Sequence, residues 1–166
     1  ARAPLGYKHK ISFLIGYLEK KGVDISYIKN EYNRINKKLI AFEQKRGKTY
    51  RDKVYEELEY LVDTYYTTIC SFLELDPIDM ETENNLMRRD SVEILLKELQ
   101  SDYNIHDMKV KVSALDEALK CQFERKIDYL LKECALIENP YYPENFWWRH
   151  PSKFRAANDE FGGKIT

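Results

Sequence analysis

The stretch ISYIKNEYNRINKKLIAF, residues 25–42, decides the fold. Its apolar side chains alternate at intervals of three and four residues, at Ile25, Ile28, Tyr32, Ile35, Leu39 and Phe42. This spacing is typical of a helix that buries one stripe against neighbouring helices. Asp24 or Ser26 is expected to open this helix and Gly47 to end it. The stretch therefore predicts a helical protein.

Helical periodicity continues on both sides of this stretch. We expect further helices at about residues 7–21, 49–72, 90–103 and 104–138, with a short helix or loop between residues 76 and 85. Residues 108–112 alternate like a strand, so a last helix that begins only at Ser113 is the competing interpretation. No second strand-like run is available to pair with them, which favours one long helix.

The predicted fold is an all-α bundle of four to five helices over residues 1–139, followed by an irregular, aromatic-rich C-terminal extension over residues 140–166. Gly22 is the expected C-cap of the first helix. The gap after Gly47 is only two residues long, so the helices on either side of it are predicted to form an antiparallel hairpin. The long C-terminal helix would complete the bundle.

Composition indicates a globular, intracellular protein. The chain has 166 residues, 43% of them apolar and 33% charged, which suits one domain with a real core. Its three cysteines, Cys70, Cys121 and Cys134, have no CxxC spacing. They favour buried thiols in a reducing compartment, such as the cytoplasm or an organelle matrix, over disulfides, with a reactive thiol as the alternative. The longest apolar run, residues 11–18, is too short to span a membrane.

Charge is unevenly distributed along the chain. The first 50 residues carry a net charge of +8 and the next 50 a net charge of −8. Four bases on the 25–47 helix could follow a phosphate backbone, namely Arg34, Lys37, Lys38 and Lys45. Arg34, Lys38 and Lys45 are expected on the face opposite the apolar stripe. Nucleic-acid binding is therefore an alternative function, and a solvated helix face is the simpler interpretation.

No motif for catalysis, metal binding or a cofactor stands out in the sequence. Glu56, Glu59 and Asp63 recur at i, i+3 and i+7, as acids do in some helical magnesium sites. Helix geometry turns them away from the apolar stripe, so we expect a solvated acidic face and neither a metal site nor a cofactor. The histidines lie far apart and none is at ligand spacing from a cysteine. An enzyme whose site is assembled from distant residues stays open as a further alternative.

Residues 139–151, NPYYPENFWWRHP, concentrate aromatic side chains where prolines prevent a helix. The segment should pack either on the bundle, as a closing strap, or into a partner. A third possibility is a platform on which nucleobases stack. The candidate partner-binding residues are Tyr141, Tyr142, Phe146, Trp147, Trp148 and Arg149. Neighbouring tryptophans point to opposite sides of an extended chain, so we expect one buried ring and one outward ring, the latter forming an apolar patch with Phe146 or Tyr142.

These features favour a non-enzymatic role. We expect a helical protein-interaction module, an assembly subunit or an adaptor that binds a protein partner or a second copy of itself. Its contact surfaces would be the tyrosine-rich helix faces and the aromatic C-terminal segment.

Overall fold

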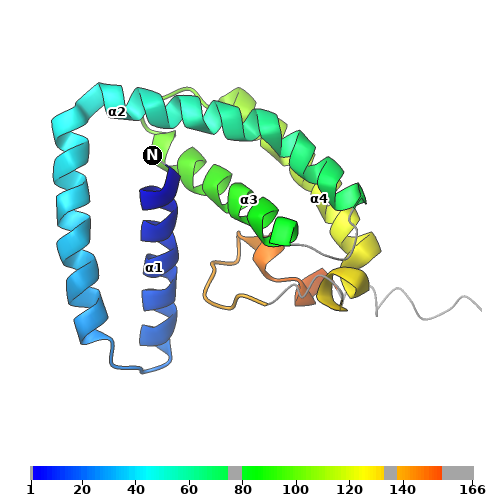
Figure 1. Ribbon diagram of the computed structural model, residues 1–166, viewed down its shortest axis with the longest axis horizontal. Helices are drawn as coiled ribbons and strands as arrows, with labels where there is room; N and C mark the ends of the chain where they lie inside the picture. The colour runs from blue at the N-terminus through cyan, green and yellow to red at the C-terminus, as the bar shows by residue number, and fades with distance from the viewer. Residues whose placement is uncertain (1, 75–79, 133–137, 155–166) are drawn as a thin grey trace, which may run out of the picture.

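The computed structural model describes residues 2–74, 80–132 and 138–154. Four α-helices form most of this part of the chain (Figure 1). They are α1 (Arg2–Lys20), α2 (Ser26–Glu74), α3 (Met80–Leu99) and α4 (His106–Lys132), followed by one 3-10 turn, η1 (Trp147–Arg149). No strand occurs in these ranges, and the strand-like run at residues 108–112 lies within α4. The predicted all-α class is confirmed.

α1 and the first part of α2 form an antiparallel pair, which we call the N-terminal hairpin (α1 with residues 26–46; Figure 1). Gly22 has a φ of 72°, the left-handed conformation expected of the predicted C-cap. Asp24 then opens α2, because its Oδ1 accepts hydrogen bonds from the backbone nitrogen of Ser26 at 3.0 Å and from its Oγ at 2.7 Å. An ion pair between Glu19 and Lys29 joins the two helices beside the turn.

Gly47 makes a corner in α2. Its φ of 52° and ψ of −135° are not helical, although the helix continues on both sides. Before Gly47 the helix runs beside α1, and after it the helix turns away across α3 and α4 (Figure 1). The predicted antiparallel pairing of these two helices is therefore wrong. A single non-helical residue redirects a helix axis, whereas a reversal of direction needs a loop of about 2–5 residues.

The body of the protein consists of residues 48–74 of α2 packed on α3 and α4. Its core side chains are almost fully buried and come from all three helices, among them Leu58, Val62, Leu86, Val92, Leu99, Leu119 and Phe123. α3 begins at Met80, so Asp90, the predicted start of a helix, lies in the middle of one instead. α4 begins at His106, whose backbone nitrogen donates to Oδ1 of Asn104 at 3.2 Å. The interpretation with a helix starting at Ser113 is thus wrong.

The C-terminal segment, residues 138–154, lies beside α3 between α1 and the end of α4 (Figure 1). Its rings join the core through contacts with three helices. Phe146 meets Phe13 of α1 at 5.2 Å between ring centroids, and Trp147 meets Phe123 of α4 at 5.7 Å. No helix in the described part of the chain has an apolar stretch long enough to cross a membrane.

Candidate interaction surface

The predicted partner-binding residues of the C-terminal segment mostly face the interior of the protein. Tyr142 and Phe146 are 4% exposed, Arg149 is 1% exposed and Trp148 is fully buried. The two remaining candidates are partly buried against the core: Tyr141 and Trp147. One tryptophan is therefore buried and the other is nearer the surface, as expected. Phe146 and Tyr142 do not form an exposed patch with it, because both are covered by the body and by α1.

A single buried carboxylate, Asp90 of α3, holds the C-terminal segment in place. It accepts hydrogen bonds from the Tyr142 hydroxyl at 2.9 Å and from Nε1 of Trp148 at 2.8 Å. Arg149 donates through Nε at 3.0 Å and through Nη2 at 2.6 Å. Asp90 and Arg149 are both nearly inaccessible to solvent, so their charges compensate each other inside the protein. Burial and the nearby Asp90 charge raise the pKa of Tyr142, which stays a neutral donor.

The preceding residue, Arg89, ties α3 to the other side of the body. Its Nε and Nη2 donate to the two carboxylate oxygens of Asp116 in α4, at 2.8 and 2.7 Å. The Tyr65 hydroxyl of α2 donates to the same carboxylate at 2.6 Å. The Arg89 guanidinium also lies over the Trp148 ring, 4.0 Å from its centroid. Although burial alone would lower the pKa of Arg89, its bonds to Asp116 raise it, so the pair stays charged.

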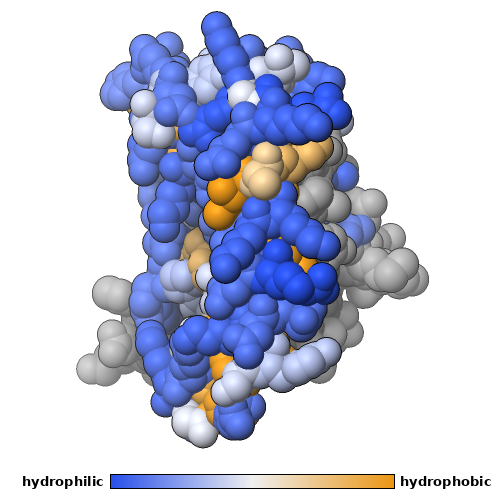
Figure 2. Space-filling model, turned by 90° about the vertical axis from the view of Figure 1, so that its left-hand side faces the viewer, coloured by the Kyte–Doolittle hydropathy of each residue, from blue (hydrophilic) through white to orange (hydrophobic). Residues whose placement is uncertain are grey.

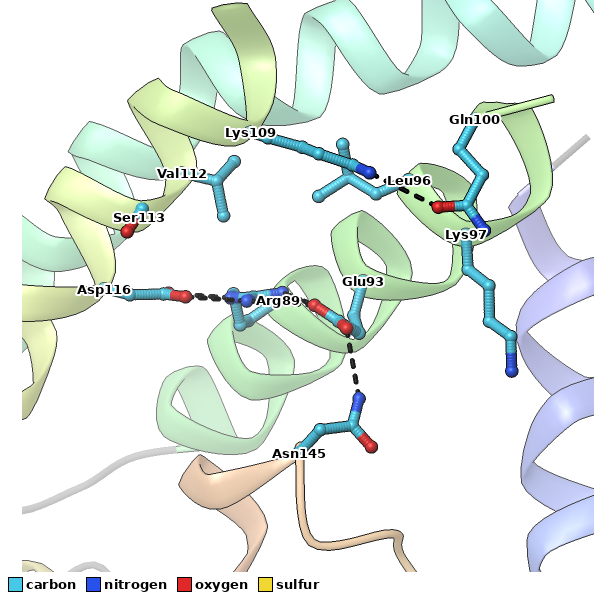
Figure 3. A pocket seen from close by; sticks show the side chains of 10 residues that line it. All are labelled: Arg89, Glu93, Leu96, Lys97, Gln100, Lys109, Val112, Ser113, Asp116 and Asn145. Atoms are coloured by element: carbon cyan, nitrogen blue, oxygen red, sulfur yellow. Dashed lines mark hydrogen bonds and ion pairs between the residues drawn. The ribbon is translucent and has the colours of Figure 1, made fainter. Parts of the chain in front are cut away.

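A polar pocket of about 570 Å³ lies beside this network, between α3, α4 and the C-terminal segment. Figure 3 shows that Arg89 points toward Asp116 and Glu93, whereas the Lys97 side chain points away from them. Arg89 is already bonded to Asp116 and Glu93, Asn145 donates to Glu93 at 3.1 Å, and Lys109 donates to Gln100 at 3.3 Å. Because its main polar groups satisfy one another, this pocket is best explained as part of the scaffold.

The apolar stripe that decided the fold is largely exposed. Of the six stripe residues, Ile28 is 48%, Ile35 58% and Phe42 46% exposed, and only Ile25 at the turn is buried. The stripe lines a groove between α1 and α2, which we call the hairpin groove. Its volume is about 430 Å³, and the residues lining it are Lys8, Ile11, Tyr27, Ile28, Glu31, Tyr32, Ile35, Asn36 and Leu39. Figure 2 views the molecule from the side on which the first part of α2 lies in Figure 1, and it shows separate apolar patches between hydrophilic side chains.

The four candidate nucleic-acid residues are all exposed on the N-terminal hairpin: Arg34, Lys37, Lys38 and Lys45. Arg34 is engaged locally, since its Nη2 donates to Glu31 at 2.7 Å. The three lysines have no ion pair within the described residues. Lys38 and Lys45 each follow an apolar stripe residue by three positions, which makes them surface neighbours of Ile35 and Phe42. The expected position opposite the stripe is therefore wrong for Lys38 and Lys45, which place positive charge at the edge of the stripe.

The acidic residues singled out as possible metal ligands face solvent, as predicted. Glu56, Glu59 and Asp63 are exposed, and Asp63 pairs with Lys111 of α4 at 2.6 Å. Across the described part of the chain, no three His, Cys, Asp or Glu side chains lie close enough together to hold a metal. Two of the histidines make single carboxylate contacts, His9 with Glu98 at 3.0 Å and His150 with Glu138 at 2.8 Å.

Sequence analysis missed the two buried aspartates. Asp90 stands four residues after Leu86 and four before Ile94, both of them buried, so helical spacing places it on an apolar face. The predicted helix over residues 90–103 begins at Asp90, ten residues after the start of α3, so the apolar residues before Asp90 do not enter that prediction. For Asp116, the corresponding signal is its position between Val112 and Leu119 on the buried stripe of α4.

No protein-family profile, curated protein or solved structure matches this chain. Its function is therefore inferred from its own contacts, burial and charge.

Proposed function

We propose that this protein is a non-enzymatic helical interaction module, an assembly subunit or adaptor, and that it binds a protein partner through the hairpin groove. One observation carries this proposal. A heptad-like stripe, the usual signature of a helix packed in a bundle, is left about half exposed at Ile28, Ile35 and Phe42. Full burial of one such side chain is worth about 1.5–3 kcal/mol. A partner covering several of them would gain appreciable free energy.

The C-terminal segment contributes to this role by holding α1 in position. Its buried residues position α1 through the ring contacts of Phe13 with Tyr142 at 5.6 Å and with Phe146 at 5.2 Å. Tyr141 and Trp147 stay candidate contact residues, because both keep part of their surface accessible. The main contact surface in this proposal is thus the hairpin groove, and the C-terminal segment is a strap that fixes the hairpin to the body.

The test uses a matched pair of exposed β-branched residues on helices. Ile35 lines the groove and is 58% exposed, whereas Val110 lies on α4 outside the groove and is 57% exposed. The full chain, Ile35→Asp and Val110→Asp would each be used to capture binding proteins from an extract, with quantitative mass spectrometry as the readout. We expect at least one protein to be captured by the unchanged chain and by Val110→Asp but not by Ile35→Asp. Equal capture by all three proteins would contradict the proposal.

Nucleic-acid binding is the second candidate, favoured by the three unpaired lysines on the N-terminal hairpin. Fluorescence anisotropy with single- and double-stranded oligonucleotides at low salt tests it. We expect affinity to fall steeply with salt and to disappear when Arg34, Lys38 and Lys45 are changed to Glu. A wild-type protein that binds neither oligonucleotide at low salt would eliminate this candidate.

A further inference from the structure

Resting on the proposed function, we infer that the hairpin groove accepts an amphipathic helix with acidic residues flanking its apolar stripe. The partner class is thus an acidic helical segment of another protein.

The groove has the dimensions of a helix site. Its α2 wall runs from Tyr27 to Leu39, and at about 1.5 Å per residue this is roughly 18 Å, or just over three helical turns. Two antiparallel helices with apolar side chains between them present ridges and grooves into which a third helix packs. A bound helix would insert side chains at i, i+3 or i+4, and i+7 between Ile11 on α1 and Ile35 on α2.

The edges of the groove are basic on both sides. Lys8 of α1 lines one wall. Lys38 follows Ile35, a residue of the other wall, by three positions, so helical spacing makes the two surface neighbours on α2. Lys45 continues this edge beside Phe42. Glu31, the one acid in the lining, is hydrogen-bonded to Arg34 and so contributes little free negative charge. Carboxylates on a bound helix would therefore meet lysines along both flanks.

A second copy of the chain is a poorer occupant. Residues 26–46 hold six Lys or Arg against two Asp or Glu, and α1 adds further lysines against the single acid Glu19. Pairing this hairpin with itself would bring like charges together along the contact, which disfavours association. The same asymmetry favours an acidic partner and would speed its encounter with the groove.

The experiment uses two synthetic fluorescein-labelled peptides of about 20 residues. Both carry leucines at alternating three- and four-residue spacing, with flanks of glutamate in one and lysine in the other. Binding to the full-length chain is measured by fluorescence anisotropy. We expect the glutamate peptide to bind at least about tenfold more tightly than the lysine peptide, and this preference to shrink at high salt.

Matched variants locate the binding. Ile35→Asp should abolish it and Val110→Asp should leave it unchanged. Tyr27→Ala, at a groove residue that is 79% exposed, tests the groove with little risk to folding and should weaken binding. The double change Lys38→Glu with Lys45→Glu should reverse the peptide preference. The control for charge is Lys53→Glu with Arg125→Glu. Both residues lie outside the groove, so this variant should keep the preference for the glutamate peptide.

Three outcomes would overturn the inference. Equal binding of both peptides would remove the acidic preference, and binding by neither would remove the helical occupant. In both cases the proposed function would stand if protein capture still depended on Ile35. A wild-type protein that light scattering shows to be a dimer, and that Ile35→Asp makes monomeric, would identify a second copy as the occupant.

Discussion

The N-terminal hairpin and the C-terminal segment are both rich in apolar side chains, yet they differ in how far the fold buries those side chains. The C-terminal segment is irregular apart from the 3-10 turn at Trp147–Arg149 and the helical residues 152–154, and four of its candidate residues are buried. The N-terminal hairpin is regular helix, and its stripe residues Ile28 and Ile35 stay about half exposed. Regular periodicity therefore indicates how a segment folds, but not whether this chain covers it.

The difference has a physical cause. The C-terminal segment reaches groups that only the tertiary fold provides, namely the Asp90 carboxylate and the rings of Phe13 and Phe123. Residues 26–46 have α1 on one side, but Gly47 turns the rest of α2 away before it could cover the other side. The hairpin groove is therefore open, because the part of α2 after Gly47 does not cover it.

The largest expected effect is at Asp90, where removal of its charge should release the strap. In Asp90→Asn, the buried Arg149 loses its ion pair with Asp90, and breaking one partner of a buried pair costs about 3–5 kcal/mol. Urea unfolding measures this loss. Asp63→Asn is the matched control, because its ion pair is exposed and such pairs contribute only about 0.2–1 kcal/mol. Similar losses in the two variants would mean that Asp90 does not hold the segment.

A smaller difference is expected between the unfolding free energies lost on truncating one leucine of the body and one leucine of the N-terminal hairpin. Leu58 is fully buried, so Leu58→Ala should cost about 2–5 kcal/mol of unfolding free energy. Leu39 is only partly buried and lines the open groove, so Leu39→Ala should cost clearly less, although its heptad position alone would predict a similar loss. Denaturant melts of both variants provide the measurement. Equal losses would indicate that the groove is closed in solution.

The smallest expected effects concern two carboxylates, one at each region. A hydrogen bond from His9 holds the pKa of Glu98 below its usual value, against the opposing effect of burial. Burial also opposes the shift at Glu138, where bonds from His150 and Ser152 lower the pKa. A lowered folded-state pKa gives stability that is present above the unfolded-state pKa of about 4.3 and is lost as pH falls through the folded-state pKa.

Glu98→Gln and Glu138→Gln should therefore each flatten the decline of stability below about pH 4.3. Glu98 links α3 to the base of the N-terminal hairpin, and Glu138 fixes the C-terminal segment to itself. Urea midpoints measured between about pH 3 and pH 7 test both variants. Curves that run parallel to that of the unchanged protein would show that neither contact forms.

The sequence predicted the helical class and the ends of the first turn correctly, because Gly22 and Asp24 act locally. The direction in which the chain leaves Gly47 could not be predicted in the same way. It depends on one pair of backbone angles and on how residues 48–74 pack against α3 and α4. The strap is similar, since the aromatic motif predicted packing but not its anchor, Asp90, which lies 58 residues before Trp148.

Hydroxyl-radical footprinting of the full-length protein, read by mass spectrometry, tests the contrast between the two regions most directly. It compares the modification rates of side chains of the same type, Tyr27 in the hairpin groove and Tyr142 in the C-terminal segment. Tyr27 is 79% exposed and Tyr142 4% exposed. We predict fast modification of Tyr27 and Ile35, with protection of Tyr142 and Trp148. Protection of Tyr27 and Ile35 together with fast modification of Tyr142 and Trp148 would contradict both the open groove and the buried strap.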